Sequence, residues 1–207
     1  KRFFLPKSTQ LTINNFTEKN PFKLLYVSSI EPYKNHCQVI EAVAALRSKG
    51  FPVNLKLIGS ATHHALISLK KKIKQVDPFY EFIDYLGFIP FEKLESYYNG
   101  AEIIIFASSC ETFGQTLLES MASGKPIVCS KKRPMSDILG DAGLYFDYES
   151  IESIANTLQV FIESADLRLK KSKMALKRAK NYSWERCTNE TFTFLSKVLE
   201  ESYNKDD

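Results

Sequence analysis

Short apolar runs alternate with longer amphipathic segments along most of the chain. Six runs rich in Val, Ile, Leu, Phe and Tyr read as strands buried on both faces, at 24–27, 53–59, 81–87, 102–107, 126–129 and 143–146. Between them, apolar residues recur every three or four positions, which predicts helices at 36–49, 62–76, 91–99 and 114–123. From residue 150 onward three helical segments follow, with a break near Asn181 and a cap at Ser183.

Strands that alternate with helices form βαβ units, whose right-handed crossovers cover both faces of a parallel sheet. We therefore expect an α/β fold: a Rossmann-like, doubly wound six-stranded parallel sheet with extra C-terminal helices. Its predicted parts are a leading linker at 1–22, a nucleotide-binding domain at 23–182 and a C-terminal helix and tail at 183–207. In such sheets ligands bind beyond the carboxyl ends of the strands, near the point where strand order switches.

Composition narrows the class of protein. The 207 residues are 44% hydrophobic and 25% charged, with a net charge of +4, as in an ordinary globular protein. The basic runs at 70–72 and 131–133 are too short for a nucleic-acid arm, and no apolar run approaches the roughly 20 residues that cross a bilayer. The four cysteines lie far apart without metal-ligand spacing, which is typical of reduced thiols in a cytoplasmic protein. The start at Lys1, without Met, reads as the middle of a longer chain.

The loop after the first strand ends in Lys34, directly before a helix. A cation is unfavourable there, because the helix dipole is positive at its N-terminus. An anion bound between Lys34 and another helix N-terminus would account for it. The alternative is a solvated surface lysine without a specific role.

The loop after the fourth strand carries a second set of polar groups. Gly114 opens a helix, so the free amides of Gly114, Gln115 and Thr116 form a candidate phosphate site. Glu111 precedes this helix and Glu119 lies inside it, so both carboxylates can face one ligand. Their alternatives are a helix-entry carboxylate for Glu111 and a surface helix residue for Glu119.

The two glutamates, separated by seven residues, begin a match to a known family. The matching segments run in order from 86 to 185: Leu86–Pro90, Leu94, Tyr98, Ala101–Glu102, Ser108, Glu111–Gly114, Leu118–Val128, Gly140–Phe146 and Ser183–Glu185. With them the chain resembles, over roughly residues 1–200, the C-terminal donor-binding domain of a family 4 retaining glycosyltransferase (glycosyl transferases group 1) with the GT-B fold.

This resemblance implies a hexosyltransferase-type enzyme that uses a UDP-, GDP- or ADP-sugar and needs no metal or other cofactor. The N-terminal acceptor-binding domain would be missing, so this half alone would be inactive; Phe3 and Phe4 resemble the stretch after the interdomain linker, and the helix at about 184–200 resembles the one that crosses back to that domain. The full-length enzyme would act in polysaccharide or glycolipid biosynthesis, with no nucleic-acid partner, in the cytoplasm or at the inner face of a membrane.

The resemblance also implies residue roles. Lys34 would contact the donor diphosphate and Glu111 the sugar hydroxyls, as the catalytic pair, while Glu119 would bind the ribose. The amides of Phe113, Gly114, Gln115 and Thr116 would face the sugar and phosphates, and Phe88 and Ile89 would lie near the base, against Gly59. Ser28 and Ser29 stand where the family has Gly-Arg or a similar pair. If that Arg normally shares the phosphate charge, either Lys34 carries more of it or the absent domain contributes.

Other functions fit parts of the pattern. A non-catalytic nucleotide-sugar-binding module would have the same architecture, although the retained Lys34, Glu111 and Glu119 favour an enzyme. An epimerase, a phosphorylase and a response-regulator-like domain are further alternatives. The chain has no segment that matches the cofactor-binding lysine of a phosphorylase, and no acidic pocket after the first strand such as a response regulator needs. We interpret His36, His63 and His64 as surface or capping residues, Cys110 as a small buried thiol, and Trp184 as a packing anchor for the last helix.

Overall fold

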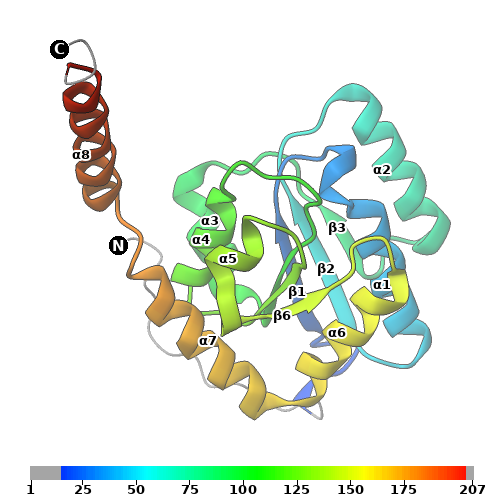
Figure 1. Ribbon diagram of the computed structural model, residues 1–207. Helices are drawn as coiled ribbons and strands as arrows, with labels where there is room; N and C mark the ends of the chain where they lie inside the picture. The colour runs from blue at the N-terminus through cyan, green and yellow to red at the C-terminus, as the bar shows by residue number, and fades with distance from the viewer. Residues whose placement is uncertain (1–14, 204–207) are drawn as a thin grey trace.

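The computed structural model describes residues 15–203, and within them a single parallel sheet forms the centre (Figure 1). Its strands are β1 Phe22–Val27, β2 Val53–Ile58, β3 Ile83–Tyr85, β4 Ile103–Phe106, β5 Ile127–Ser130 and β6 Leu144–Phe146. They lie in the order β3-β2-β1-β4-β5-β6, and every pairing is parallel. The predicted doubly wound sheet is therefore confirmed.

The helices are α1 His36–Ser48, α2 His63–Val76, α3 Phe91–Gly100, α4 Gln115–Ala122, α5 Met135–Leu139, α6 Ile151–Glu163, α7 Ala165–Ala179 and α8 Trp184–Tyr203, with single turns η2 Pro32–Lys34 and η3 Gly140–Ala142. The three predicted helical segments after residue 150 are α6, α7 and α8. Helix α5 was not predicted, because its five residues are too few to show a helical period.

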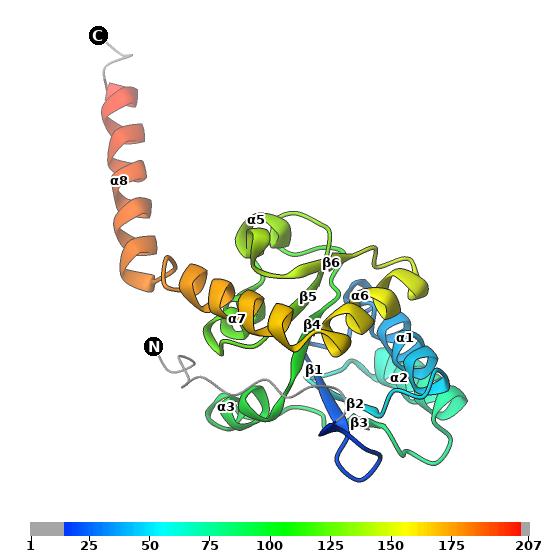
Figure 2. The ribbon, with the colours of Figure 1, turned by 90° about the horizontal axis from the view of Figure 1, so that it is seen from below.

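Two helical layers sandwich the sheet (Figure 2). Along β1, Leu24 and Tyr26 pack with α1, α2 and α6, whereas Leu25 and Val27 pack with α3, α4, α5 and α7. This alternation follows from the two-residue period of a strand, whose successive side chains point to opposite faces. Burial on both faces is why the strands read as continuous apolar runs.

Strand β1 begins two residues earlier than predicted. Phe22 is fully buried and packs edge-on against Phe16, with ring centroids 4.7 Å apart. The exposed Lys23 interrupts the apolar run at that point, which hid the start of the strand. Most of the predicted linker, residues 1–14, lies outside the described residues. The predicted resemblance of Phe3 and Phe4 to the stretch after an interdomain linker falls in this part.

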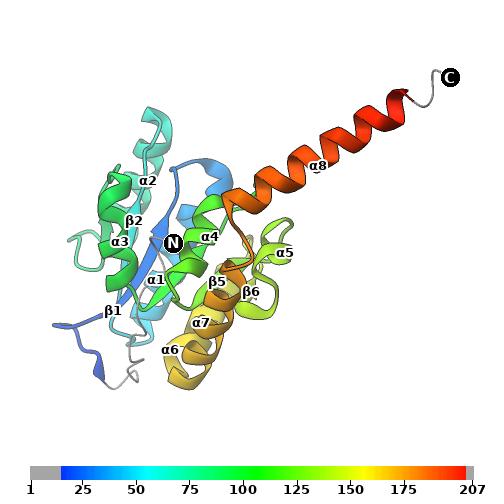
Figure 3. The same cartoon turned by 90° about the vertical axis from the view of Figure 1, so that its left-hand side faces the viewer.

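Helix α8 projects away from the body of the domain (Figure 3). Every side chain from 184 to 202 is exposed, and Trp184 retains 79% of its accessible surface. The interpretation of Trp184 as a packing anchor was therefore wrong, because most of its surface is exposed in the described part of the chain.

Candidate functional site

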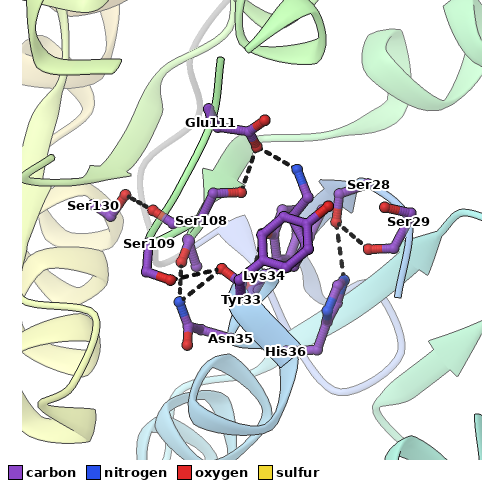
Figure 4. A network of polar contacts seen from close by, with 12 residues as sticks. Ser28, Ser29, Tyr33, Lys34, Asn35, His36, Ser108, Ser109, Glu111 and Ser130 are labelled. Atoms are coloured by element: carbon purple, nitrogen blue, oxygen red, sulfur yellow. Dashed lines mark hydrogen bonds and ion pairs between the residues drawn. The ribbon is translucent and has the colours of Figure 1, made fainter. Parts of the chain in front are cut away.

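The strand order brings two loops together at the switch point of the sheet, between β1 and β4. One loop follows β1 and the other follows β4, and hydrogen bonds join them (Figure 4). The amide of Ser109 donates to the Tyr33 carbonyl at 2.8 Å, and the side-chain amide of Asn35 donates to the Ala107 carbonyl at 2.7 Å. These contacts hold Lys34 against the β4 loop.

Lys34 is the last residue of the single turn η2 and lies in the interior. Its backbone carbonyl accepts a hydrogen bond from the Tyr26 hydroxyl at 2.7 Å. Only 9% of its side chain is exposed, and the rings of Tyr33 and Phe106 lie 5.1 and 5.9 Å from the ammonium. The alternative of a solvated surface lysine is therefore wrong, because a buried cation needs an anion nearby.

Glu111 supplies that anion. Its Oε1 forms an ion pair with Nζ of Lys34 and accepts a second hydrogen bond from the Ser108 hydroxyl at 2.6 Å. The Glu111 side chain is only 14% exposed. The sequence predicts these two residues on different loops with separate roles, but the structure joins them directly.

Helix α4 begins beside this pair with an open N-terminus. Gly114 occupies the N-cap position in the left-handed region, with φ 83°, and no side chain caps the helix. Within the described residues the amides of Gly114, Gln115 and Thr116 donate to no partner. They are the donors that an anion at the helix N-terminus uses.

Phe113 precedes the helix and is half-exposed. Its ring lies 6.2 Å from that of Tyr182, in an edge-on arrangement. Tyr182 belongs to the short connection between α7 and α8. The β4 loop is therefore in contact with the base of the projecting helix.

Glu119 lies inside α4 and faces a different neighbour. Its Oε2 accepts a hydrogen bond from the Tyr98 hydroxyl of α3 at 3.3 Å. Burial raises the pKa of the Glu119 carboxyl, and the hydrogen bond from Tyr98 opposes that shift. No contact joins Glu119 to Glu111 in the described chain, so the two carboxylates border different parts of the site.

The loops after β2 and β3 form the other wall. A Cβ on Gly59 would lie 1.9 Å from the Ser28 carbonyl oxygen, so only glycine permits this approach to the β1 loop. The Gly59 carbonyl accepts a hydrogen bond from the Tyr85 hydroxyl at 2.9 Å. Beyond this point Phe88 is 72% exposed and Ile89 is partly buried, so one of the two residues predicted near the base presents an open aromatic ring.

His36 also lies beside Lys34 and Ser28, although no functional role was predicted for it. It is the first residue of α1 and is only 3% exposed, and no side chain caps this helix, so its interpretation as a surface or capping residue was wrong. Its Nε2 lies 3.0 Å from the Ser28 hydroxyl, and its ring stacks on Tyr26 at 4.6 Å. Burial lowers the pKa of His36 to about 3, and the charge of Lys34 acts in the same direction.

Cysteines and possible metal ligands add little to the site. Cys110 is exposed beside Glu111, which corrects its interpretation as a buried thiol, and the four cysteines are unpaired. Within residues 15–203, His, Cys, Asp and Glu side chains form no group of three that could hold a metal ion. In the same residues, no helix is both long and apolar enough to span a membrane.

A family model and curated relatives place the chain in the same protein family. Residues 9–181 match the family model described as glycosyl transferases group 1. The chain is 29% identical over 170 residues to the O-antigen chain mannosyltransferase B of Escherichia coli, covering 81% of this chain and 44% of that protein. It is 28% identical over 186 residues to the D-inositol 3-phosphate glycosyltransferase of Corynebacterium efficiens, covering 86% and 42%. The chain thus spans less than half the length of these curated relatives.

Solved structures show the same architecture. The Anabaena protein HepE, crystallised with UDP and glucose, superposes with a TM-score of 0.77 at 20% identity, over 86% of this chain and 49% of that one. The C-terminal domain of LpcC, a group 1 glycosyl transferase from Francisella tularensis, superposes with a TM-score of 0.71 at 26% identity, over 86% and 94%. The chain therefore has the fold of one half of a GT-B enzyme.

Proposed function

We propose, since the chain belongs to the group 1 glycosyl transferases, that it is the donor-binding half of a retaining glycosyltransferase. The observation that carries this proposal is the Lys34–Glu111 ion pair beside the open N-terminus of α4. A cation and free amides suit a diphosphate, and the carboxylate suits the sugar attached to it.

The proposed chemistry follows from where charge develops. Breaking the anomeric bond leaves negative charge on the diphosphate and positive charge on the sugar ring. Lys34 and the amides of 113–116 would stabilise the leaving diphosphate more strongly than the intact donor, which lowers the barrier. Glu111 would bind the sugar hydroxyls and favour the positive ring. No step in this scheme requires a metal or another cofactor.

The rest of the donor would extend along the sheet. Glu119, already partnered by Tyr98, has one oxygen left for the ribose hydroxyls, and Phe88 and Ile89 would lie along the base. The HepE structures hold UDP or UDP-glucose, which supports a nucleoside diphosphate sugar as the ligand class. The proposed donor is accordingly a UDP-, GDP- or ADP-sugar.

We further propose that an acceptor-binding domain covers α8. Its apolar side chains, which are all exposed, share one face of the helix: Trp184, Phe192, Phe194, Leu195, Val198 and Leu199. A helix that is apolar along one face and unpacked needs a partner surface. The chain's share of its relatives' length leaves room for a second domain of similar size. Action in polysaccharide or glycolipid synthesis, in the cytoplasm or at a membrane face, is part of the same proposal.

The test compares binding with turnover. Calorimetry of this chain against UDP, GDP and ADP should show binding of one nucleoside diphosphate, whereas the chain alone should transfer no sugar. The full-length protein should transfer sugar from the corresponding sugar nucleotide. Binding without turnover in the full-length protein would instead support the second candidate, a non-catalytic nucleotide-sugar-binding module. Absence of binding to all three nucleotides, by the chain and by the full-length protein, would contradict both.

A further inference from the structure

The contact between His36 and Ser28 has no part in the scheme above. Ser28 directly follows β1 and is 6% exposed, and its amide donates to the Ile58 carbonyl at 2.9 Å. The close approach of Gly59 to its carbonyl fixes the backbone further. Figure 4 shows the His36 ring directed at the Ser28 hydroxyl, next to Lys34. Both partners are therefore held in place before any ligand arrives.

The second ring nitrogen of His36 identifies the tautomer. Nδ1 is buried and has no hydrogen-bond partner among the described residues. If Nδ1 carried the proton, a buried N–H donor would be left without an acceptor, which proteins avoid more strictly than an unused acceptor. If Nε2 carries it, the proton goes to the Ser28 oxygen and only a lone pair stays unused. The neutral Nε2–H form is therefore favoured, and the low pKa of His36 excludes the imidazolium near neutral pH.

The direction of this hydrogen bond determines what Ser28 can do. With its oxygen accepting from His36, the hydroxyl proton must point elsewhere. It reaches the Ser29 carbonyl in a long contact of 3.2 Å and also lies next to the Tyr26 hydroxyl. A better acceptor can replace the long contact. The hydroxyl lies at the carboxyl end of β1, on the same loop as Lys34.

We propose that His36 is a positioning residue that commits the Ser28 hydroxyl to donate a hydrogen bond to the diphosphate of the donor substrate. The inference rests on the proposed function for the identity of the acceptor. Ser28 then adds a neutral donor beside the Lys34 ammonium, and His36 acts only through Ser28. Replacing His36 should therefore weaken diphosphate binding only in a chain that retains the Ser28 hydroxyl.

The tautomer can be measured without any ligand. Nitrogen NMR of the chain labelled in its histidine rings, at pH 7, should show His36 protonated at Nε2 and bare at Nδ1. The signal is assigned by its loss in His36→Gln, because His63 and His64 are the remaining histidines. An Nδ1–H tautomer, or a charged ring at this pH, would overturn the inference.

A double-mutant cycle tests the action through Ser28. Whichever of UDP, GDP and ADP binds is titrated into Ser28→Ala, His36→Leu and the double variant. Each single change should weaken the nucleoside diphosphate about 3- to 10-fold, and the double variant should be no weaker than Ser28→Ala. His36→Gln, whose amide can still donate to Ser28, should retain most of the affinity. The free nucleoside should bind all variants alike, and the exposed His63→Leu serves as the control.

The outcomes distinguish a failure of the role proposed for His36 from a failure of the proposed function. Additive losses, or an equal loss for the free nucleoside, would mean that His36 only packs in the core, and would overturn this inference while leaving the proposed function intact. A wild-type chain and a full-length protein that bind none of the three nucleoside diphosphates would overturn the proposed function, and with it the diphosphate as the acceptor for Ser28.

Discussion

Lys34 and Glu111 neutralise each other across the switch point of the sheet, where the ammonium from the β1 loop is paired with the carboxylate from the β4 loop. Both side chains are largely buried, so neither charge is compensated by bulk water. A diphosphate that enters this site must therefore compete with Glu111 for Lys34. The separate roles assigned to the two residues from the sequence become coupled in this way.

Replacing Glu111 should have opposite effects on two ligands. In Glu111→Gln the ammonium is released and the repulsion between carboxylate and phosphate disappears, so the bare nucleoside diphosphate should bind about 3- to 10-fold more tightly. The sugar nucleotide should gain less, because it loses the carboxylate contact to its hydroxyls, and turnover of the full-length enzyme should fall. Calorimetry with both ligands checks this, with the exposed Glu200→Gln as control. A weaker bare diphosphate would contradict the proposed competition.

Replacing Lys34 should affect phosphate binding selectively. Lys34→Ala removes a charged donor, which is worth ~1.5–3 kcal/mol, so the nucleoside diphosphate should bind roughly 10- to 100-fold more weakly. The nucleoside should be almost unaffected, and added salt should reduce the difference between wild type and variant. The exposed Lys74→Ala on α2 is the control. Equal losses for nucleoside and diphosphate would indicate that Lys34 only supports the local fold.

Replacing Glu119 should remove discrimination at the ribose. Wild-type chain should prefer a nucleoside diphosphate over its 2′-deoxy form, and Glu119→Gln should weaken only the ribose form, by about 1–3 kcal/mol. The two forms should then bind the variant almost equally. Calorimetry of both proteins with both ligands gives the four affinities. A preference that survives in Glu119→Gln would assign the ribose to another residue.

The strands of the sheet could be predicted from the sequence because a strand that is buried on both faces consists of consecutive apolar residues, as in residues 103–106. It also placed Lys34 and Glu111 on loops at the same edge. It could not show that they pair, because that contact joins residues 77 positions apart and depends on how the two loops close. The burial of His36 could not be predicted for a similar reason. A polar residue two positions after Lys34 is expected to be exposed, and the sequence does not show that Asn35 takes a left-handed conformation, with φ 56°, at the start of α1.

Acid should destabilise the chain through His36. Its pKa of about 3 in the folded state lies below the ordinary 6.5, so the unfolded chain binds more protons between these values and stability falls as pH falls through that window. Between pH 6.5 and 4.5 this single group should remove ~2 kcal/mol from the free energy of unfolding. Urea unfolding should show that His36→Gln lacks this part of the loss, whereas His63→Gln retains it. Parallel losses in wild type and His36→Gln would show that His36 does not titrate as its burial implies.

Removing α8 should leave the domain stable. Because every described side chain from residue 184 onward is exposed, truncation after Ser183 deletes no buried apolar contact. The urea midpoint should change by less than that of Phe161→Ala, a buried core change that typically costs about 3–5 kcal/mol. A large loss of stability would show that α8 packs on the domain in solution.

The ring contact between Phe113 and Tyr182 links the β4 loop to the connection that precedes α8. Arg186 of α8 donates to the Asn181 carbonyl at 3.2 Å, so the first turn of the helix is tied to the residue beside Tyr182. Under the proposed function, a ligand that orders Phe113 would also restrict the directions that α8 can take, and a protein bound along α8 would restrict Phe113. By thermodynamic linkage the two effects have the same coupling free energy. Substrate capture and interdomain docking would then be cooperative events, each strengthening or weakening the other by the same factor.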